Sequence, residues 1–194
     1  TADAVISKNS NKGTYDTIKA YADWIADNVS YDHSAARLSA SEITDNSPWN
    51  AISVFDNDSS TNVVCEGYAK AFQYLMDNTP RFVSAGITSK IVTSTVRVTH
   101  GSSSAASGSS IGADDETTGH MWNVVTIAGK NYLVDVTWYD TDSAVPYRTK
   151  YLLGGEEAAE SDTSGLHEYD SDTTGFYSYD ELELSESAYD SSIA

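Results

Sequence analysis

The sequence predicts an α+β fold, with helices in the first half of the chain and an antiparallel sheet in the second. Apolar residues recur at helical spacing over residues 14–29 and 65–77. Residues 90–98 are rich in Ile, Val and Thr, and two further β-rich segments, 120–127 and 131–138, flank a short turn. Helices and strands are therefore segregated along the chain, which is typical of an α+β protein.

The length of the chain favours one domain. A chain of 194 residues usually forms a single domain, or one domain with a small appendage. We expect one domain over residues 1–194, with its core at about residues 15–155 and an acidic, weakly patterned extension at 156–194. This extension either completes the sheet or covers a groove.

The first predicted helix, over residues 14–29, carries one apolar stripe. The stripe consists of five residues: Ile18, Tyr21, Ala22, Ile25 and Val29. Further along, the turn Ser47-Pro48-Trp49 precedes a short predicted helix at residues 51–55. Both helices belong to the helical half of the chain.

The second strong helix begins at Cys65, the only cysteine of the chain, and runs to about Asp77. Thr61 and Asn62 are both candidate N-caps for this helix, and Asn78-Thr79-Pro80 ends it. Its apolar residues fall on one face: Cys65, Tyr68, Ala69, Phe72, Leu75 and Met76. The cysteine therefore starts a stripe that faces the rest of the domain.

The second half of the chain alternates strand and turn signals. Residues 101–119 are rich in Ser and Gly and predict a long flexible loop, which is either a lid or specificity loop or a tolerated surface insertion. Ala128-Gly129-Lys130 predicts the turn of a hairpin. Tyr151-Leu152-Leu153 predicts a further strand, which Gly154-Gly155 ends.

The charge of the chain excludes some classes of partner. It has 29 acidic and 11 basic residues and a net charge of −18, whereas nucleic-acid binding needs a basic footprint. No apolar run approaches the roughly 20 residues that span a bilayer, so we expect no membrane insertion. An acidic surface permits cationic partners, but more generally it keeps a protein soluble and monomeric, and we expect a monomer.

We expect neither a metal nor a cofactor. The acidic runs Asp56-Asn57-Asp58 and Asp114-Asp115-Glu116 do not complete a calcium-binding motif. His33, His100 and His167 stand apart from one another, and no Cys/His spacing indicates zinc.

A cysteine at the start of a helix is a candidate nucleophile. The N–H groups and the dipole of the first turn stabilise a thiolate, and the same N–H groups can bind the oxyanion of a tetrahedral intermediate. Gly67 and Ala69 keep the first turn of this helix slim, which leaves room for a substrate beside Cys65. The alternative is that Cys65 is a small buried apolar residue.

The hairpin supplies a base and a carboxylate. If Ala128 and Gly129 are the central residues of the turn, His120 and Asp135 are diagonal neighbours on one face, and shifting the turn by one residue keeps them on that face. A carboxylate in an apolar strand needs a partner when it is buried. Asp135 is suited to orienting His120 so that the other ring nitrogen meets a thiol. A nucleophile, a base and an orienting acid thus follow one another in chain order.

On these residues the chain resembles the transglutaminase-like superfamily of papain-like thiol enzymes, in its bacterial branch. The matching blocks extend over about residues 15–140 and are Tyr21-Ala22-Asp23-Trp24-Ile25 through Tyr31-Asp32, Val64-Cys65-Glu66-Gly67-Tyr68-Ala69, Gly86-Ile87, His120-Met121-Trp122-Asn123-Val124 and Tyr132-Leu133-Val134-Asp135-Val136-Thr137-Trp138. One departure is Val63, which stands where the family often has a glycine.

The resemblance implies a papain-like core in which the cysteine helix packs on an antiparallel sheet. It also implies that Cys65 is the nucleophile, His120 the base and Asp135 the orienting residue. The family has a second oxyanion donor on an upstream side chain. Trp49 and Tyr68 are the candidates for this donor, and Trp122 either shields the His–Asp pair at the substrate groove or packs as an ordinary core residue.

The function expected from this resemblance is acyl transfer through a thioester on Cys65. Water resolves the thioester in a protease or amidase, and an amine resolves it in a protein-crosslinking transglutaminase; we favour hydrolysis, because water is always present. The other alternative is a non-catalytic binding or structural module with the same fold. The expected partner is a protein or peptide, including cell-wall peptides, and the composition is typical of secreted or cell-surface bacterial proteins.

Overall fold

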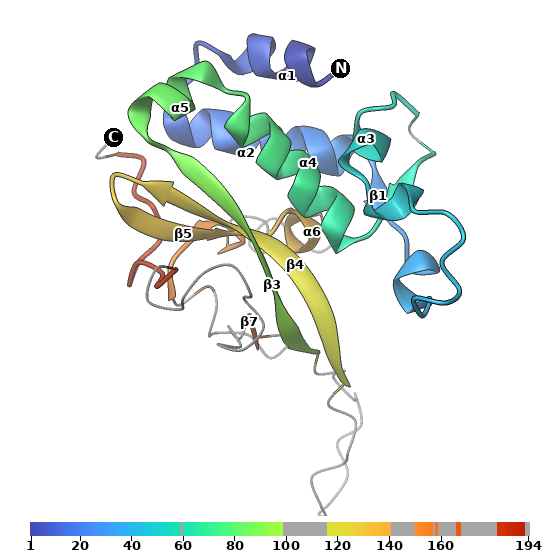
Figure 1. Ribbon diagram of the computed structural model, residues 1–194. Helices are drawn as coiled ribbons and strands as arrows, with labels where there is room; N and C mark the ends of the chain where they lie inside the picture. The colour runs from blue at the N-terminus through green and yellow to red at the C-terminus, as the bar shows by residue number, and fades with distance from the viewer. Residues whose placement is uncertain are drawn as a thin grey trace, which may run out of the picture.

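The computed structural model (Figure 1) shows a layer of helices packed against an antiparallel sheet, which is the predicted α+β fold. It describes residues 1–58, 60–98, 116–140, 150–156, 158, 166–167 and 182–192. None of the helices in these residues is long and apolar enough to span a bilayer.

The helical layer centres on α4, which packs on the sheet with one side and contacts α2 and α3 with others. The helices of this layer are α1 (Ala2–Asn9), α2 (Thr14–Asn28), α3 (Ala51–Val54), α4 (Cys65–Asp77) and α5 (Pro80–Ala85), with short 3-10 turns at Ala35–Arg37 and Ser47–Trp49. The structure confirms the predicted helices α2, α3 and α4. It adds α1 and α5, for which the sequence pattern made no prediction.

The first residue of α4 is Cys65, as predicted, but neither Thr61 nor Asn62 occupies the N-cap position. Val64 occupies the N-cap position without a side-chain hydrogen bond to the helix. The Thr61 hydroxyl instead bonds to Asp56, and Asn62 belongs to a short strand. The start of α4 is therefore fixed by its neighbours in the fold and not by a local cap.

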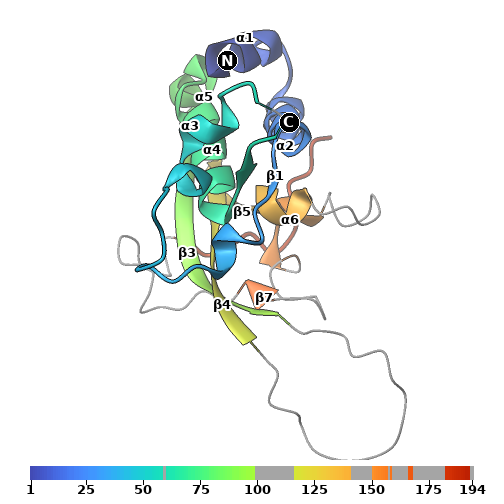
Figure 2. The same ribbon diagram turned by 90° about the vertical axis from the view of Figure 1, so that its right-hand side faces the viewer.

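The strands of the main sheet run in the order β6-β5-β4-β3-β7 in the described part of the chain, and every neighbouring pair is antiparallel. Their bounds are β3 (Thr88–Val98), β4 (Glu116–Ile127), β5 (Lys130–Val134), β6 (Leu152–Gly154) and β7 (Leu166–His167). The C-terminal end of β3 and the N-terminal end of β4 extend beyond the helical layer (Figure 2). The side chains of α4 and of β4 bury a common core, with Phe72, Leu75, Trp122 and Val124 almost completely inaccessible.

The predicted register of the β4–β5 hairpin is confirmed. Ile127 pairs with Lys130, which makes Ala128 and Gly129 the central residues of the turn. Both have left-handed backbone angles, with φ of 52° and 77°, as a two-residue hairpin turn with the right twist requires. Since side chains alternate along each strand, this register determines which residues of β4 and β5 share a face.

Two of the predicted boundaries are wrong. The strand predicted over 131–138 ends at Val134, and the chain then forms α6 (Val136–Tyr139), because the Asp135 carboxylate caps this helix by accepting a hydrogen bond from the Trp138 N–H. The loop predicted over 101–119 ends earlier, because residues 116–119 pair with β3 as part of β4. Residues 101–115 lie outside the described residues.

A small parallel pair connects the start of α4 to the end of α2. Strand β1 (Ser30–Tyr31) pairs with β2 (Asn62–Val63), with Tyr31 opposite Val63. The Asp32 N–H also donates to the carbonyl of Val63, at 3.0 Å. This pairing brings Tyr31 beside the residues that precede Cys65.

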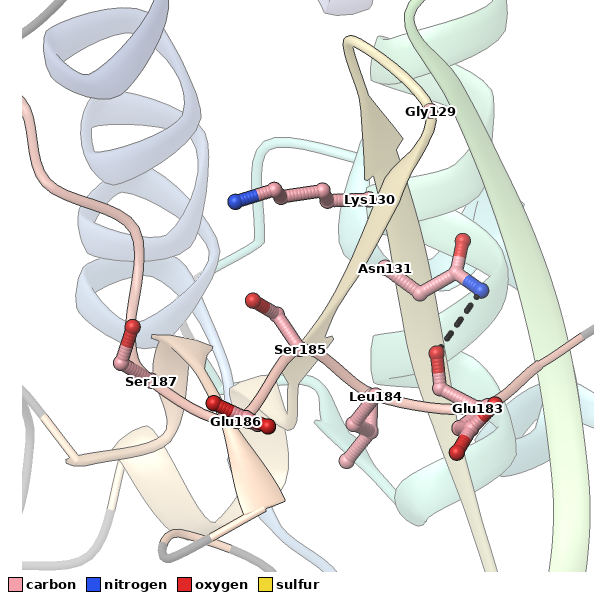
Figure 3. Close-up of a pocket in the computed structure, with 8 residues that line it drawn as sticks. All are labelled: Gly129, Lys130, Asn131, Glu183, Leu184, Ser185, Glu186 and Ser187. Atoms are coloured by element: carbon pink, nitrogen blue, oxygen red, sulfur yellow. Dashed lines mark hydrogen bonds between the residues drawn. The ribbon is translucent and has the colours of Figure 1, made fainter.

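The C-terminal residues 182–192 border the sheet at the turn end of the hairpin. Leu184 forms a parallel bridge with Asn131, and the Ser185 N–H donates to the Asn131 carbonyl at 2.9 Å. An open pocket of about 360 Å³ lies between this segment and the hairpin. Figure 3 shows its lining residues, among which the Asn131 side chain donates to the carbonyl of Glu183. The pocket lies at the opposite end of β5 from Asp135.

Candidate active site

The thiol of Cys65 lies at the N-terminal end of α4 and is partly exposed. The 3-10 turn before it is packed closely on this end of the helix: Val64 donates its N–H to the Pro48 carbonyl at 2.9 Å. A Cβ atom on Gly67 would lie 2.8 Å from the same carbonyl and 2.8 Å from Val63 Cβ, so that only glycine fits there. The thiol is thus accessible on a tightly packed support, at the end of the helix that stabilises negative charge.

The imidazole of His120 connects the thiol to a carboxylate. Its Nε2 lies 2.6 Å from Oδ2 of Asp135, and the Cys65 side chain lies close enough to the ring to raise its pKa. With Nε2 bonded to Asp135, Nδ1 is the ring nitrogen left for the thiol. His120 is 7% exposed and Asp135 is 0% exposed, so the three side chains run from a partly exposed nucleophile to a fully buried acid.

The carboxylate of Asp135 is held at both oxygens. Oδ2 accepts the hydrogen bond from His120, while Oδ1 accepts one from the Trp138 N–H at 3.1 Å. Its own backbone N–H donates to the Tyr151 carbonyl at 2.9 Å. A fully buried carboxylate with this set of partners has one orientation, and it fixes the orientation of the imidazole in turn.

The charge state of His120 follows from these contacts. Burial by itself lowers the pKa of the imidazole, but the charge and hydrogen bond of Asp135, followed by those of Cys65, outweigh it and hold the pKa well above the usual 6.5. His120 therefore stays protonated at neutral pH, and its positive charge stabilises a thiolate on Cys65.

Two indole rings stack on the imidazole. Trp122 lies with its ring centroid 5.7 Å from that of His120 and at 27° to it, and Trp138 lies at 5.5 Å and 26°. Aromatic faces attract a cation and exclude water, so both tryptophans favour the imidazolium form of His120.

The remaining predicted residues have identifiable surroundings. Trp122 lies against His120 and is almost completely buried. Trp49 is partly buried in the 3-10 turn beside α4, and its carbonyl accepts a hydrogen bond from Lys70 Nζ at 3.4 Å. Tyr68 is fully buried, and its hydroxyl donates its one hydrogen to Oδ2 of Asp140.

Two residues of the site were not predicted. The sequence pattern places Trp138 in a strand, whereas its position on His120 follows from helix α6. Tyr31 reaches the site through the β1–β2 pairing, for which no local sequence signal exists. Burial first, and then the charges of Cys65 and Asp135, raise the pKa of Tyr31 to about 12, so its hydroxyl keeps its hydrogen within electrostatic reach of the thiol.

No protein-family model and no curated protein sequence matches the chain. One similar solved structure is described as "Crystal structure of a TGase". It is 17% identical in sequence, with a TM-score of 0.44, and the matched part covers 74% of this chain and 33% of that one. The chain therefore spans about a third of the length of that structure.

Proposed function

We propose that this protein is a cysteine-dependent acyl-transfer enzyme that hydrolyses peptide bonds or related amide bonds. The observation that carries the proposal is the arrangement of three side chains: His120 is bonded to Asp135 at 2.6 Å, and Cys65 lies close enough to the imidazole to raise its pKa. A partly exposed thiol, a buried imidazole and a fully buried carboxylate are the arrangement that nucleophilic catalysis needs.

The first half of the reaction forms a thioester. Because His120 already holds the proton at neutral pH, Cys65 reacts as a thiolate, and its sulfur attacks the carbonyl carbon of the substrate, which forms a C–S bond and a tetrahedral oxyanion. The imidazolium then gives its proton to the nitrogen of the leaving amine as the C–N bond breaks. The acyl group is now attached to Cys65 and the amine is free to leave.

The second half restores the enzyme. His120, now neutral, takes a proton from water as the oxygen attacks the thioester carbonyl; the C–S bond breaks and releases a carboxylic acid. Water is our proposed acceptor, since transfer to an amine needs a dedicated site that is poor in water. A transglutaminase uses the same thioester, and a binding module would use none of these steps.

The oxyanion is bound by the N-terminal end of α4 together with one side chain. Trp49 remains the predicted donor, and the protonated hydroxyl of Tyr31 is a second candidate because it lies within the electrostatic reach of Cys65. The hydroxyl of Tyr68 is bonded to Asp140. We further propose a peptide substrate outside the cell, and the net charge of −18 favours cationic peptides.

The thioester is the species to detect. We would incubate the protein with p-nitrophenyl acetate, an activated ester that acylates a reactive thiol without resembling a particular peptide substrate. The acetylated residue would be identified by mass spectrometry after rapid acid quenching. We expect a burst of nitrophenolate and one acetyl group on Cys65 that hydroxylamine removes. The Cys65→Ala variant should give no adduct, and His120→Ala should form the adduct at least tenfold more slowly.

The same assay separates the alternatives. Adding glycinamide as an acceptor should leave the rate of deacylation unchanged if water is the acceptor. Appearance of acetyl-glycinamide as the main product would instead favour the transglutaminase alternative. A wild-type protein that forms no adduct on Cys65 would contradict enzymatic function and favour the binding module.

A further inference from the structure

The helix that Asp135 caps is too short to hold its own position. Helix α6 has four residues, and isolated helices shorter than about 12 residues are marginal in water. The orientation of Asp135, and through it that of His120, therefore depends on the contacts that hold α6 in the fold. Figure 1 shows α6 beside α4, and it packs against both α4 and α2.

One of these contacts joins α6 to the helix of the nucleophile. The hydroxyl of Tyr68 donates to Oδ2 of Asp140, the residue that follows α6 directly. Tyr68 comes three residues after Cys65 on α4, and residues at this spacing share a helix face. Tyr68 is 0% exposed and Asp140 is partly buried, and a hydrogen bond to a carboxylate is stronger than one between neutral groups.

We propose that Tyr68 and Asp140 are a positioning pair, whose hydrogen bond holds the Cys65 thiol in line with the imidazole of His120. The bond ties the first turn of α4, which carries the nucleophile, to the C-terminal end of α6, whose N-terminal end carries the orienting acid. This inference rests on the proposed function, because it assigns the pair a role in the geometry of that same site.

A second contact holds α6 against α2 and does not involve the helix of Cys65. The Tyr139 hydroxyl donates to Asp23 on α2, and Lys19 Nζ binds the same carboxylate at 2.7 Å. This contact fixes α6 relative to α2. The Tyr68–Asp140 bond instead joins the helix of Cys65 to the end of α6, and so it acts on the distance between thiol and imidazole.

Loss of the Tyr68–Asp140 bond is expected to lower the reaction rate much more than loss of a buried hydroxyl elsewhere in the fold. A shift of about 1 Å in a catalytic group can cost about a hundredfold in rate. The pKa of His120 is raised by the Asp135 and Cys65 side chains, and both contacts depend on distance. Loosening α6 therefore changes the pH dependence of thiol reactivity and not only the stability of the fold.

The test compares four variants with the wild type: Tyr68→Phe, Asp140→Ala, the double variant and the control Tyr21→Phe. Tyr21 is a matched control, because its hydroxyl makes a buried bond of 2.7 Å to Thr79 away from the site. The readout is the rate of Cys65 alkylation by iodoacetamide at pH 6 and pH 9, alongside the melting temperature.

We expect Tyr68→Phe and Asp140→Ala each to lower the alkylation rate at pH 6 at least tenfold relative to that at pH 9. The double variant should be no worse than either single one, because both remove the same bond. Tyr21→Phe should keep the wild-type ratio, even where its melting temperature falls as much. If Tyr68→Phe does not fold, Asp140→Ala is compared with the wild type and the control instead.

Two results would overturn the inference, and they differ. Variants with lower melting temperatures but the wild-type ratio of rates would show that the pair is merely structural, while the proposed function would stand. A wild-type protein that already reacts like an ordinary thiol would contradict the proposed function and the positioning role together.

Discussion

Replacing Asp135 by Asn removes one negative charge from the site and almost nothing else. The Asn side chain has the same shape, and its oxygen can still accept the hydrogen bond that Trp138 donates to Oδ1. Its NH2 group, however, takes the place of the oxygen that lies 2.6 Å from His120 Nε2. His120 can then accept at Nε2 only as a neutral ring with its proton on Nδ1, the nitrogen that faces the thiol.

The magnitude follows from which interaction is lost. Breaking a buried ion pair costs about 3–5 kcal/mol when a charge is left behind, but here the imidazole can lose its proton instead. The expected cost is therefore that of one hydrogen bond to a charged group, about 1.5–3 kcal/mol. Since about 1.4 kcal/mol corresponds to a factor of ten, thiol activation at pH 6 should fall by at least tenfold and by up to about a hundredfold.

The assay is Cys65 alkylation by iodoacetamide at pH 6, with the melting temperature measured on the same samples. Asp135→Ala serves as the comparison, because it also removes the cap of α6 and should cost about 1 kcal/mol more in stability. If Asp135→Asn alkylates at the wild-type rate at pH 6, the carboxylate does not control the imidazole and the reasoning is refuted.

Three further predictions concern stability and the oxyanion. Because the pKa of His120 is raised in the folded protein, the charged imidazole stabilises the fold fully below pH 6.5, and this contribution is lost as the pH rises through the folded-state pKa. The difference in unfolding free energy between wild type and His120→Gln, measured by urea titration at several pH values, should therefore be largest below pH 6.5 and shrink above it. Tyr31→Phe should slow acetylation of Cys65 by about a hundredfold if its hydroxyl binds the oxyanion, whereas an unchanged burst rate would leave Trp49 as the donor. Gly67→Ala should destabilise the protein by about 1–3 kcal/mol, because its Cβ would lie 2.8 Å from the Pro48 carbonyl, and an unchanged midpoint in urea would contradict this close packing.

The parts of the fold that sequence reasoning found are those with local signals. Helices α2 and α4 have long apolar stripes, and the turn at Ala128-Gly129 determines the register of β4 and β5. Helix α6 was missed because Tyr132 to Trp138 is an almost continuous apolar run, in which the Asp135 cap competes with strand formation. The pairing of β1 with β2 joins residues about 30 positions apart, and two-residue strands have no pattern to detect.

As with the fold, the residues of the site that carry local sequence signals could be selected from the sequence. The side chains of Cys65, His120 and Asp135 were selected from residue chemistry, hairpin register and family resemblance, and the structure brings them together. What could not be predicted depends on tertiary packing. Trp138 reaches His120 only because α6 replaces the strand, and Tyr31 comes within electrostatic reach of the thiol only through the pairing of β1 with β2.

The most direct test of the account is the rate of Cys65 alkylation at pH 6 and pH 9 in the wild type and in His120→Ala. An ordinary thiol, with a pKa of about 8.5, reacts about 200-fold more slowly at pH 6 than at pH 9. We predict rates within a factor of a few of each other in the wild type and the full difference of about 200-fold in His120→Ala. A wild-type protein that itself shows this full difference would contradict a working Cys65–His120–Asp135 site.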